Sequence, residues 1–172
     1  MSQRFTITLD AADPKALGTF WATALGYVEE PPPKPYATWP EAFEGWGLPT
    51  ASHNDAYAVV DPAGVGPRFF LQKVPEPKTA KNRLHLDVWV PGETRDNPAS
   101  PDDKRAHAAF LVEHGATVLH EVDHPSGMGF WVVMADPEGN EFCVVCPQRS
   151  RGIDPTAGGL RGPPDVRADR AE

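Results

Sequence analysis

The chain has 172 residues, of which 40% are hydrophobic and 23% charged, and its formal net charge is -8 at pH 7. This length suits one domain, or two small halves that share a core. The acidic balance argues against nucleic acid or an anionic membrane as the main partner. The sequence contains no apolar run of membrane-spanning length and no signal-peptide segment, and its two cysteines favour a reducing cytoplasm over a disulfide framework.

Residues 4–10 alternate between apolar and polar side chains, which is the pattern of a half-buried strand. A helix is predicted next, because Asp13 is a good N-cap and Pro14 occupies the first helical position before an apolar stripe. Gly26 is placed to end this helix in a left-handed cap, and residues 27–29 fit a short strand.

Residues 30–56 interrupt this pattern. A proline cluster at the start excludes a helix or a central strand, and Thr38 is placed to cap one or two helical turns. Loops of this length are usually functional or disordered, and the aromatic residues here argue against disorder. We interpret the insertion as a lid over a cavity, with Trp39 and Trp46 as ligand contacts. The alternative is a flap packed against the outside of the core, or a subunit contact.

The stretch 82–90 alternates strictly. His85, Asp87 and Trp89 share one face of the predicted strand, and the other face carries Leu84, Leu86, Val88 and Val90. A solvated face would more naturally carry Lys, Glu and Thr. We therefore interpret the polar row as the lining of a cavity. The remaining predicted elements are strands over 57–61, 68–74, 116–120, 130–134 and 141–146, and a helix from Pro101 to about His114.

The two halves of the chain repeat one order of predicted elements, which is a strand, a helix and three more strands. Leu9-Asp10 recurs as Leu86-Asp87, and the turn at 60–64 recurs at 135–139 with nearly equal spacing. A unit of this length cannot bury both faces of its sheet alone, so two units are expected to pack side by side.

This repeat predicts an α+β fold of two paired β-α-β-β-β modules, at residues 4–76 and 82–146. The modules are expected to form a curved mixed sheet that encloses a cavity, with the helices on its outer face. The insertion 30–56 belongs to the first module. Residues 147–172 have almost no apolar content, which is typical of a flexible tail or an arm over the surface.

Paired modules of this kind, with Asp-Pro-x-Gly-Asn before the last strand, resemble the vicinal oxygen chelate superfamily, which includes glyoxalase I, extradiol dioxygenases and bleomycin-type resistance proteins. The words Thr-Leu-Asp-x-x-Asp-Pro, Phe-Trp-x-x-x-Leu-Gly-Tyr, Val-Val-Asp-Pro-x-Gly and Lys-Asn-Arg-Leu-His-Leu-Asp resemble its bacterial glyoxalase-like domain subgroup. The resemblance covers about residues 4–146.

The resemblance implies metal positions on the first and last strands of each module, filled by His, Gln or Glu in metal-dependent members. In the second module these positions fall on His85, a competent ligand, and on Cys143 in place of the usual Glu. In the first module the first-strand position falls on Thr6 or Thr8, which are not usual ligands. The last-strand position is Arg68, Phe70 or Gln72, of which only Gln72 can bind an ion.

The donors that survive are His85, Gln72 and Cys143. Such a soft, mixed set differs from the oxygen-rich sites of the superfamily's lyases and dioxygenases. We therefore expect no metal of the usual kind and no other cofactor, and we interpret His85 as a polar cavity residue.

Two motifs match known metal or redox sites, but their predicted secondary structure does not suit those sites. His120-Glu121-Val122-Asp123-His124 matches the zinc-protease word His-Glu-x-x-His, which requires a helix, whereas this segment reads as strand running into loop. Cys143 and Cys146 match Cys-x-x-Cys, but residues three apart on a strand face opposite ways. Cys146 is more simply a core residue.

The two equivalent carboxylates, Asp10 and Asp87, are candidates for acid–base chemistry with His85, or for structural bonds to loop amides. Arg68 is a candidate anchor for a ligand carboxylate or phosphate, or a salt-bridge partner of one of these two Asp residues. The further candidate ligand contacts are Thr6, Thr8, Phe70, Gln72, Trp89 and Cys143.

These observations predict a cytoplasmic, homodimeric protein that binds a small organic ligand without the usual divalent metal. Its role would be sequestration, as in resistance proteins, or metal-free lyase or isomerase chemistry. The alternative is a metal-dependent lyase or dioxygenase of the glyoxalase or extradiol type. A third alternative is a scaffold whose cup is filled by its own aromatic side chains.

Overall fold

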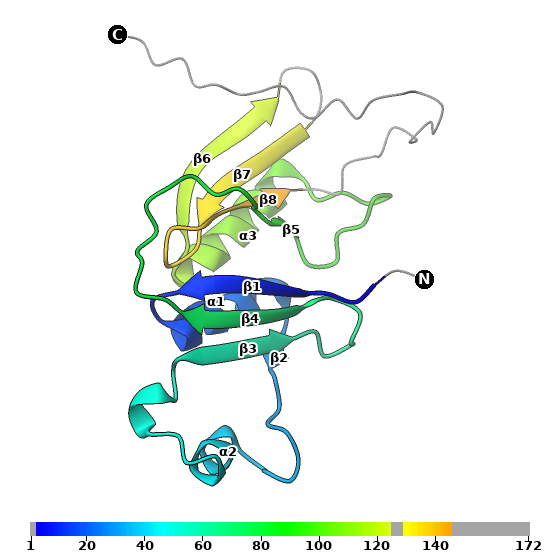
Figure 1. The fold of residues 1–172 in the computed structure, drawn as a ribbon. Helices are drawn as coiled ribbons and strands as arrows, with labels where there is room; N and C mark the ends of the chain where they lie inside the picture. Colours follow the sequence, from blue (N-terminus) through cyan, green and yellow to red (C-terminus); the bar gives the residue numbers. More distant parts are fainter. Residues whose placement is uncertain (1–2, 125–128, 146–172) are drawn as a thin grey trace.

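The computed structural model describes residues 3–124 and 129–145 (Figure 1). In chain order its elements are β1 (Thr6–Ala11), α1 (Pro14–Leu25), β2 (Val28–Glu29), α2 (Trp39–Gly45), a 3-10 turn (Thr50–Ser52), β3 (Ala56–Val60), β4 (Arg68–Lys73), β5 (Asp87–Trp89), α3 (Pro101–Glu113), β6 (Thr117–His124), β7 (Gly129–Ala135) and β8 (Glu141–Val145). Cys146 and the tail predicted at 147–172 lie outside the described residues.

The strands form two four-stranded sheets with the same topology. The first has the order β1-β4-β3-β2 and the second β5-β8-β7-β6. In each sheet the first and last strands of the module pair in parallel, and the other neighbours are antiparallel. The predicted α+β fold of two paired β-α-β-β-β modules is confirmed, and each module contributes its own sheet.

The helix ends follow from the local sequence. The Asp13 side chain accepts a hydrogen bond from the backbone N–H of Ala16 at 3.1 Å, and Gly26 ends α1 with a φ of 67°. Ser100 and Asp103 form a reciprocal capping box at the start of α3. These contacts satisfy N–H groups at each helix start, and glycine adopts the left-handed cap without a Cβ clash.

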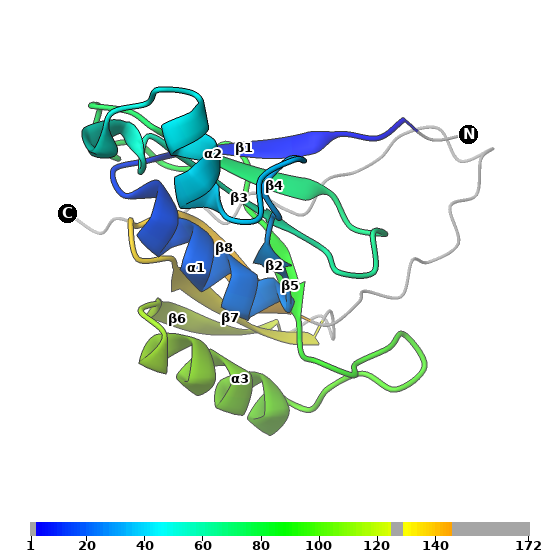
Figure 2. The same ribbon diagram turned by 90° about the horizontal axis from the view of Figure 1, so that it is seen from below.

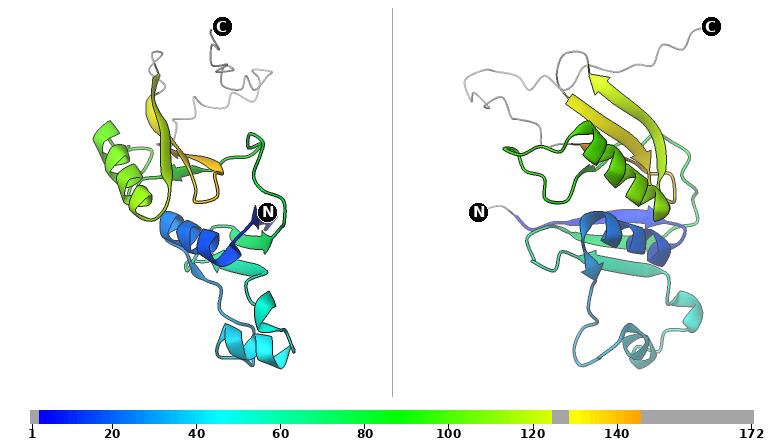
Figure 3. Two further views of the ribbon diagram at one scale, coloured as in Figure 1. Left: turned by 90° about the vertical axis from the view of Figure 1, so that its left-hand side faces the viewer. Right: turned by 180° about the vertical axis from the view of Figure 1, so that it is seen from behind.

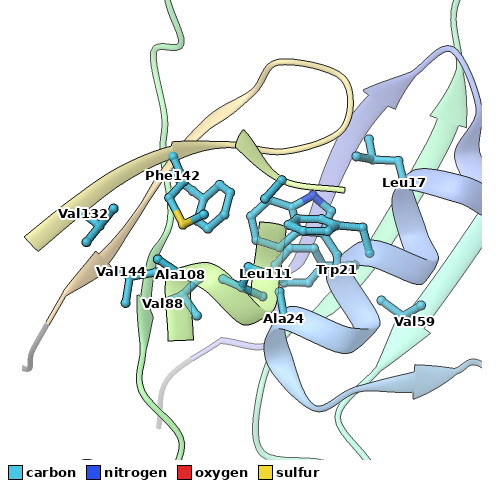
Figure 4. Packing of buried hydrophobic residues seen from close by; sticks show 14 of the residues in the cluster. Leu17, Trp21, Ala24, Val59, Val88, Ala108, Leu111, Val132, Phe142 and Val144 are labelled. Carbon is cyan, nitrogen blue, oxygen red and sulfur yellow. The ribbon is translucent and has the colours of Figure 1, made fainter. Parts of the chain in front are cut away.

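One hydrophobic core joins the two modules. Helices α1 and α3 lie on the same side of the sheets, as predicted for the outer face (Figures 2 and 3). The indole of Trp21 in α1 lies 5.9 Å from the ring of Phe69 in β4 and 5.3 Å from that of Phe142 in β8 (Figure 4). Residues from both modules therefore belong to one packed cluster.

A buried hydrogen bond fixes this packing. The indole Nε1 of Trp21 donates to Oδ2 of Asp136 at 3.2 Å, and Asp136 is only 3% exposed. Asp136 also accepts hydrogen bonds from the backbone N–H groups of Glu138 and Asn140 and from the Asn140 amide. Burial raises the pKa of the Asp136 carboxyl, against the opposing effect of these hydrogen bonds.

The same turn reaches back to the first module a second time. The carboxylate of Glu138 accepts hydrogen bonds from the backbone N–H groups of Ala12 and Asp13, both at 2.8 Å. Two carboxylates of the turn at 135–139 therefore contact the first module. Glu138 holds the residues just before α1, and the buried Asp136 holds Trp21 within the helix.

The strand predicted over 82–90 is shorter than expected. Only Asp87–Trp89 forms β5, paired with Cys143–Val145, and Leu84 is 66% exposed instead of facing the core. The backbone N–H of Cys143 still donates to the carbonyl oxygen of Leu86 at 2.9 Å, but the residues before Leu86 are not part of the strand. Similarly, Phe5 precedes the first pair of β1 and is 67% exposed.

Two further expectations can be compared with the structure. Strand β6 continues through His120 to His124, so the His-Glu-x-x-His motif is not on a helix, as predicted, but it lies on strand throughout and not on a strand that runs into a loop. Among the described residues, no helix is both long and apolar enough to cross a membrane.

Replacing Asp136 by Ala is expected to lower the free energy of unfolding by roughly 2–4 kcal/mol, because the Trp21 indole and the turn N–H groups lose their buried acceptor. Urea denaturation measures the loss. Asp61→Ala is the matched control, since the repeat places Asp61 in the equivalent turn of the first module, where it accepts only from backbone N–H groups of its own turn. A smaller loss is expected there, and equal losses would contradict the role given to the bond between modules.

Candidate functional site

The insertion 30–56 folds over the edge of the first sheet. Thr38 and Glu41 form a capping box at the start of α2, and the Trp39 indole donates a hydrogen bond to the backbone oxygen of Glu30 at 2.7 Å. The ring centroids of Trp39 and Phe43 lie 5.5 Å apart, and those of Phe43 and Trp46 6.2 Å apart. The aromatic residues therefore form a small cluster that gives the insertion its own packing.

A cavity of about 950 Å³ lies between this insertion and the sheet. The insertion contributes the aromatic residues Trp39, Phe43 and Trp46, and the sheet contributes Phe70 and Arg68 from β4. The volume is in the range of small-molecule sites. The insertion thus lies over a cavity, and four of the predicted contacts line it: Trp39, Trp46, Arg68 and Phe70.

The positive charge of Arg68 is neutralised by the Glu30 carboxylate inside the cavity. Its Nε donates to Oε1 of Glu30 at 2.8 Å and its Nη2 to Oε2 at 2.5 Å, while the guanidinium carbon lies 5.0 Å from the centroid of the Phe70 ring. Both side chains are about one-third exposed or less, at 35% and 28%. The salt-bridge partner is therefore Glu30, instead of Asp10 or Asp87, and this bidentate pair ties the insertion to β4.

A second group of polar residues lies on the second sheet. Asp87 in β5 is opposite Cys143 in β8, and the His85 Nε2 lies 3.4 Å from Oδ1 of Asp87. One donor atom from each of the three residues lies within 4.8 Å of the others. Burial, with a smaller contribution from the Asp87 charge, raises the pKa of the Cys143 thiol to about 11.

The equivalent residues of the first sheet are arranged differently. Asp10 in β1 is opposite Gln72 in β4, and the Gln72 amide donates to Asp10 Oδ1 at 2.8 Å. Thr6 and Thr8 lie on the same exposed face of β1. The structure thus brings Asp10 to Gln72 and Asp87 to His85, and neither threonine lines the cavity under the insertion.

A second cavity, of about 580 Å³, lies between the end of α1, β5 and α3. Its lining includes Asp87, Trp89 and Phe110 together with His107, which sequence reasoning did not single out. His107 is 8% exposed, and its Nε2 is buried without a hydrogen-bond partner. Burial lowers the pKa of His107. The sequence signal for its burial was its position one helical turn before Leu111, on the apolar face of the predicted helix.

The donors present do not fit the oxygen-rich metal site that the family resemblance implies. The first module supplies threonines and a glutamine whose amide is hydrogen-bonded to Asp10. The second module supplies a histidine, a carboxylate and a thiol. Hard ions such as Mg²⁺ and Mn²⁺ prefer oxygen ligands, whereas thiols select softer ions.

Paired β-α-β-β-β modules with this topology and a cavity beside the sheet define a protein of the vicinal oxygen chelate type. The family model described as glyoxalase-like domain matches residues 6–145, and the chain belongs to this family. No curated protein matches the sequence.

Solved structures share the fold at low identity. The fosfomycin resistance protein FosX from Listeria monocytogenes is 11% identical, with a TM-score of 0.54 over 87% of this chain and 96% of that chain. A glyoxalase/dioxygenase from Nostoc punctiforme is 20% identical, with a TM-score of 0.51 over 85% and 92%. A glyoxalase/bleomycin resistance protein/dioxygenase family enzyme from Burkholderia phytofirmans is 13% identical, with a TM-score of 0.51 over 81% and 94%.

The lowered pKa of His107 makes a prediction about pH. An unfolded histidine takes up a proton near 6.5, whereas the buried His107 stays neutral to lower pH, so the unfolded state binds more protons and stability falls as pH drops below about 6.5. His107→Leu is expected to reduce this fall by about 1.4 kcal/mol for each pH unit by which the pKa is lowered. Urea denaturation at pH 7 and at about pH 5, which bracket the ordinary pKa of histidine, measures this change in the free energy of unfolding. His120→Leu, at an exposed position, should leave the slope unchanged, and an unchanged slope for His107→Leu would contradict the assignment.

Proposed function

We propose that this protein binds a small organic molecule in the cavity between the insertion and the first sheet, without the usual divalent metal. The observation that carries the proposal is the cavity of about 950 Å³ walled by Trp39, Phe43, Trp46 and Phe70. Concave sites of this size, lined by aromatic residues and a few polar groups, are the common form of small-molecule sites.

The lining favours a planar, largely apolar ligand. Aromatic walls offer stacking and edge contacts to a flat ring system. Arg68 is already neutralised by Glu30, so an anionic group on a ligand would have to compete with a bidentate carboxylate. An uncharged or cationic ring system meets no such competition.

The positions of the acid–base candidates favour binding over catalysis. His85 and Asp87 form a close pair, but neither lines the cavity under the insertion. Asp10 is hydrogen-bonded to Gln72. A sequestering, resistance-type role therefore takes precedence over metal-free lyase or isomerase chemistry, which would need the His85–Asp87 pair to reach the ligand.

A metal-dependent lyase or dioxygenase is the second candidate. The observation in its favour is the convergence of His85, Asp87 and Cys143 on the second sheet. Against it stands the first module, whose first-strand position carries Thr6 or Thr8 in place of a usual ligand. Gln72, the one candidate there, is held by the hydrogen bond from its Nε2 to Asp10, which leaves only its Oε1 as a donor to an ion.

The proposal includes a homodimer and a cytoplasmic location. The paired modules of this superfamily favour the first, and exposed apolar side chains on α3 and β6 add support: Phe110, Val112, Val118 and Leu119. The low cysteine content supports the second.

Native mass spectrometry of the full chain purified from its own host is expected to show a retained small molecule and the mass of the assembly. In titrations with the neutral aromatic dye Nile red, Phe43→Ala is expected to weaken binding by about tenfold or more, because one aromatic wall is removed. Phe5→Ala is the matched control, since Phe5 is exposed and lies outside the cavity. No retained molecule and equal dye affinity in both variants would overturn the proposal.

Glu30→Gln is expected to change the charge preference of the cavity. The substitution leaves Arg68 without its carboxylate partner, so the anionic dye anilinonaphthalene sulfonate should bind several-fold more tightly and the cationic dye thioflavin T more weakly. Fluorescence titration measures both. Glu44→Gln is the control, because Glu44 is exposed on α2 and does not line the cavity. The same shift in both variants would mean that overall charge, and not the Arg68–Glu30 pair, sets the preference.

A further inference from the structure

We propose that the outer edge of strand β3, at Ala56, recognises a cyclic amide group on the ligand of the cavity under the insertion. The inference rests on the proposed small-molecule site and names the class of ligand that this site takes. That class is a flat, fused ring system in which a ring N–H and a ring C=O are neighbours. The backbone N–H and C=O of Ala56 bind these two groups as a pair.

Strand β2 is too short to cover the whole outer edge of β3. It consists of Val28–Glu29 and pairs only with residues 59 and 60. One further bond joins the N–H of Glu30 to the carbonyl oxygen of Ala58 at 2.9 Å. Residues 31–33 are prolines, which have no N–H to continue the ladder. The edge of β3 before Ala58 is therefore left without a partner strand.

The register of β3 shows which way the backbone groups of Ala56 point. The N–H of Lys73 donates to the carbonyl oxygen of Asp55 at 2.8 Å, and the next pair along the ladder is Ala56 opposite Gln72. Pairs that exchange hydrogen bonds alternate with pairs that do not, so the N–H and C=O of Ala56 point away from β4. In the part of the chain that the structure describes, neither group has a hydrogen-bond partner.

This open edge lies inside the cavity. Ala56 is exposed, and both Ala56 and Ala58 line the cavity of about 950 Å³. The insertion lies beyond β3, on the side of the first sheet away from β1 (Figure 1). It therefore takes the place of a further strand, and the space left beside Ala56 suits a small molecule.

The chemistry of the edge selects the ligand. Ala56 offers one donor and one acceptor side by side, and a cyclic amide offers the complementary acceptor and donor in one plane. A ligand without this pair would displace water from both backbone groups and leave them unsatisfied, which lowers its affinity. A ligand with the pair replaces the water with two hydrogen bonds.

The walls of the cavity agree with this choice. Aromatic side chains of the insertion line the same cavity as Ala56: Trp39, Phe43 and Trp46. Their rings favour contacts with the faces of a flat ring system, while the amide at its rim meets the strand. A neutral amide also avoids competition with the ion pair between Arg68 and Glu30.

Contacts on both sides hold the edge in place. The side-chain oxygen of Asn54 accepts a hydrogen bond from the N–H of Lys15 at 2.9 Å, and its amide nitrogen donates to Asp13 at 2.8 Å. These bonds tie the residues just before β3 to the start of α1, and β4 holds the other side of the strand. A site that is already in place loses little entropy when a ligand binds.

The test compares two neutral ligands that differ only at the amide. Carbostyril has a ring N–H beside its C=O, and N-methylcarbostyril lacks the N–H. Each displaces Nile red from the full chain in a fluorescence competition. Carbostyril is expected to bind about tenfold more tightly, because only carbostyril can donate to the carbonyl oxygen of Ala56.

A substitution at the edge tests the other half of the pair. Ala56→Pro removes the backbone N–H, and proline is tolerated at the first residue of a strand when this group faces outward. The variant is expected to bind carbostyril about tenfold more weakly and Nile red as the parent does. Ala56→Gly keeps the N–H and is the matched control, with carbostyril affinity close to that of the parent.

The outcomes separate this inference from the proposed function. Nile red binding with equal affinity for the two carbostyrils would overturn the role of the edge and leave the cavity as a binding site. Equal loss of carbostyril affinity in Ala56→Pro and Ala56→Gly would also overturn it. Absence of Nile red binding by the folded parent would overturn the proposed function as well.

Discussion

The hydrogen bond from the Trp21 indole to the buried Asp136 carboxylate is the contact on which the arrangement of the two modules depends. Helix α1 packs on the first sheet, and the core is continuous with the second sheet where Phe20 and Trp21 contact the ring of Phe142 in β8. Apolar packing sets no unique orientation, whereas a buried donor and acceptor must meet within a narrow range of distance and angle. The bond therefore fixes the position of α1 against the second module, with the Glu138 carboxylate holding the start of the same helix.

The insertion is held beside the first sheet by contacts of its own. The Arg68–Glu30 pair anchors one side, and the Trp39 indole anchors the helix α2 to the backbone of Glu30. Because both anchors converge on one residue, the aromatic cluster of the insertion can move little without breaking a bidentate ion pair. That constraint explains how a segment rich in proline keeps a volume open beside β4.

Local signals were sufficient for much of this fold. Caps at Asp13 and Ser100 act within one helical turn, so the helix starts follow from neighbouring residues, and the repeat revealed the paired modules. The alternation of 82–90 predicted a longer strand than forms, since only Asp87–Trp89 pairs with β8 and Leu84 is exposed. The sequence did not predict the roles of Glu30 and His107, because each role depends on contacts with residues far away along the chain.

The repeat also explains why the two modules need not share a function. Identical topology places Asp10 opposite Gln72 and Asp87 opposite Cys143, so a single residue on the last strand decides what each aspartate can do. An amide donor closes the first pair as a structural hydrogen bond. In the second module Cys143 stands at the corresponding place, and the Asp87 carboxylate faces His85 instead. The insertion adds a cavity beside the first sheet, so the proposed ligand site belongs to one copy of the repeated fold.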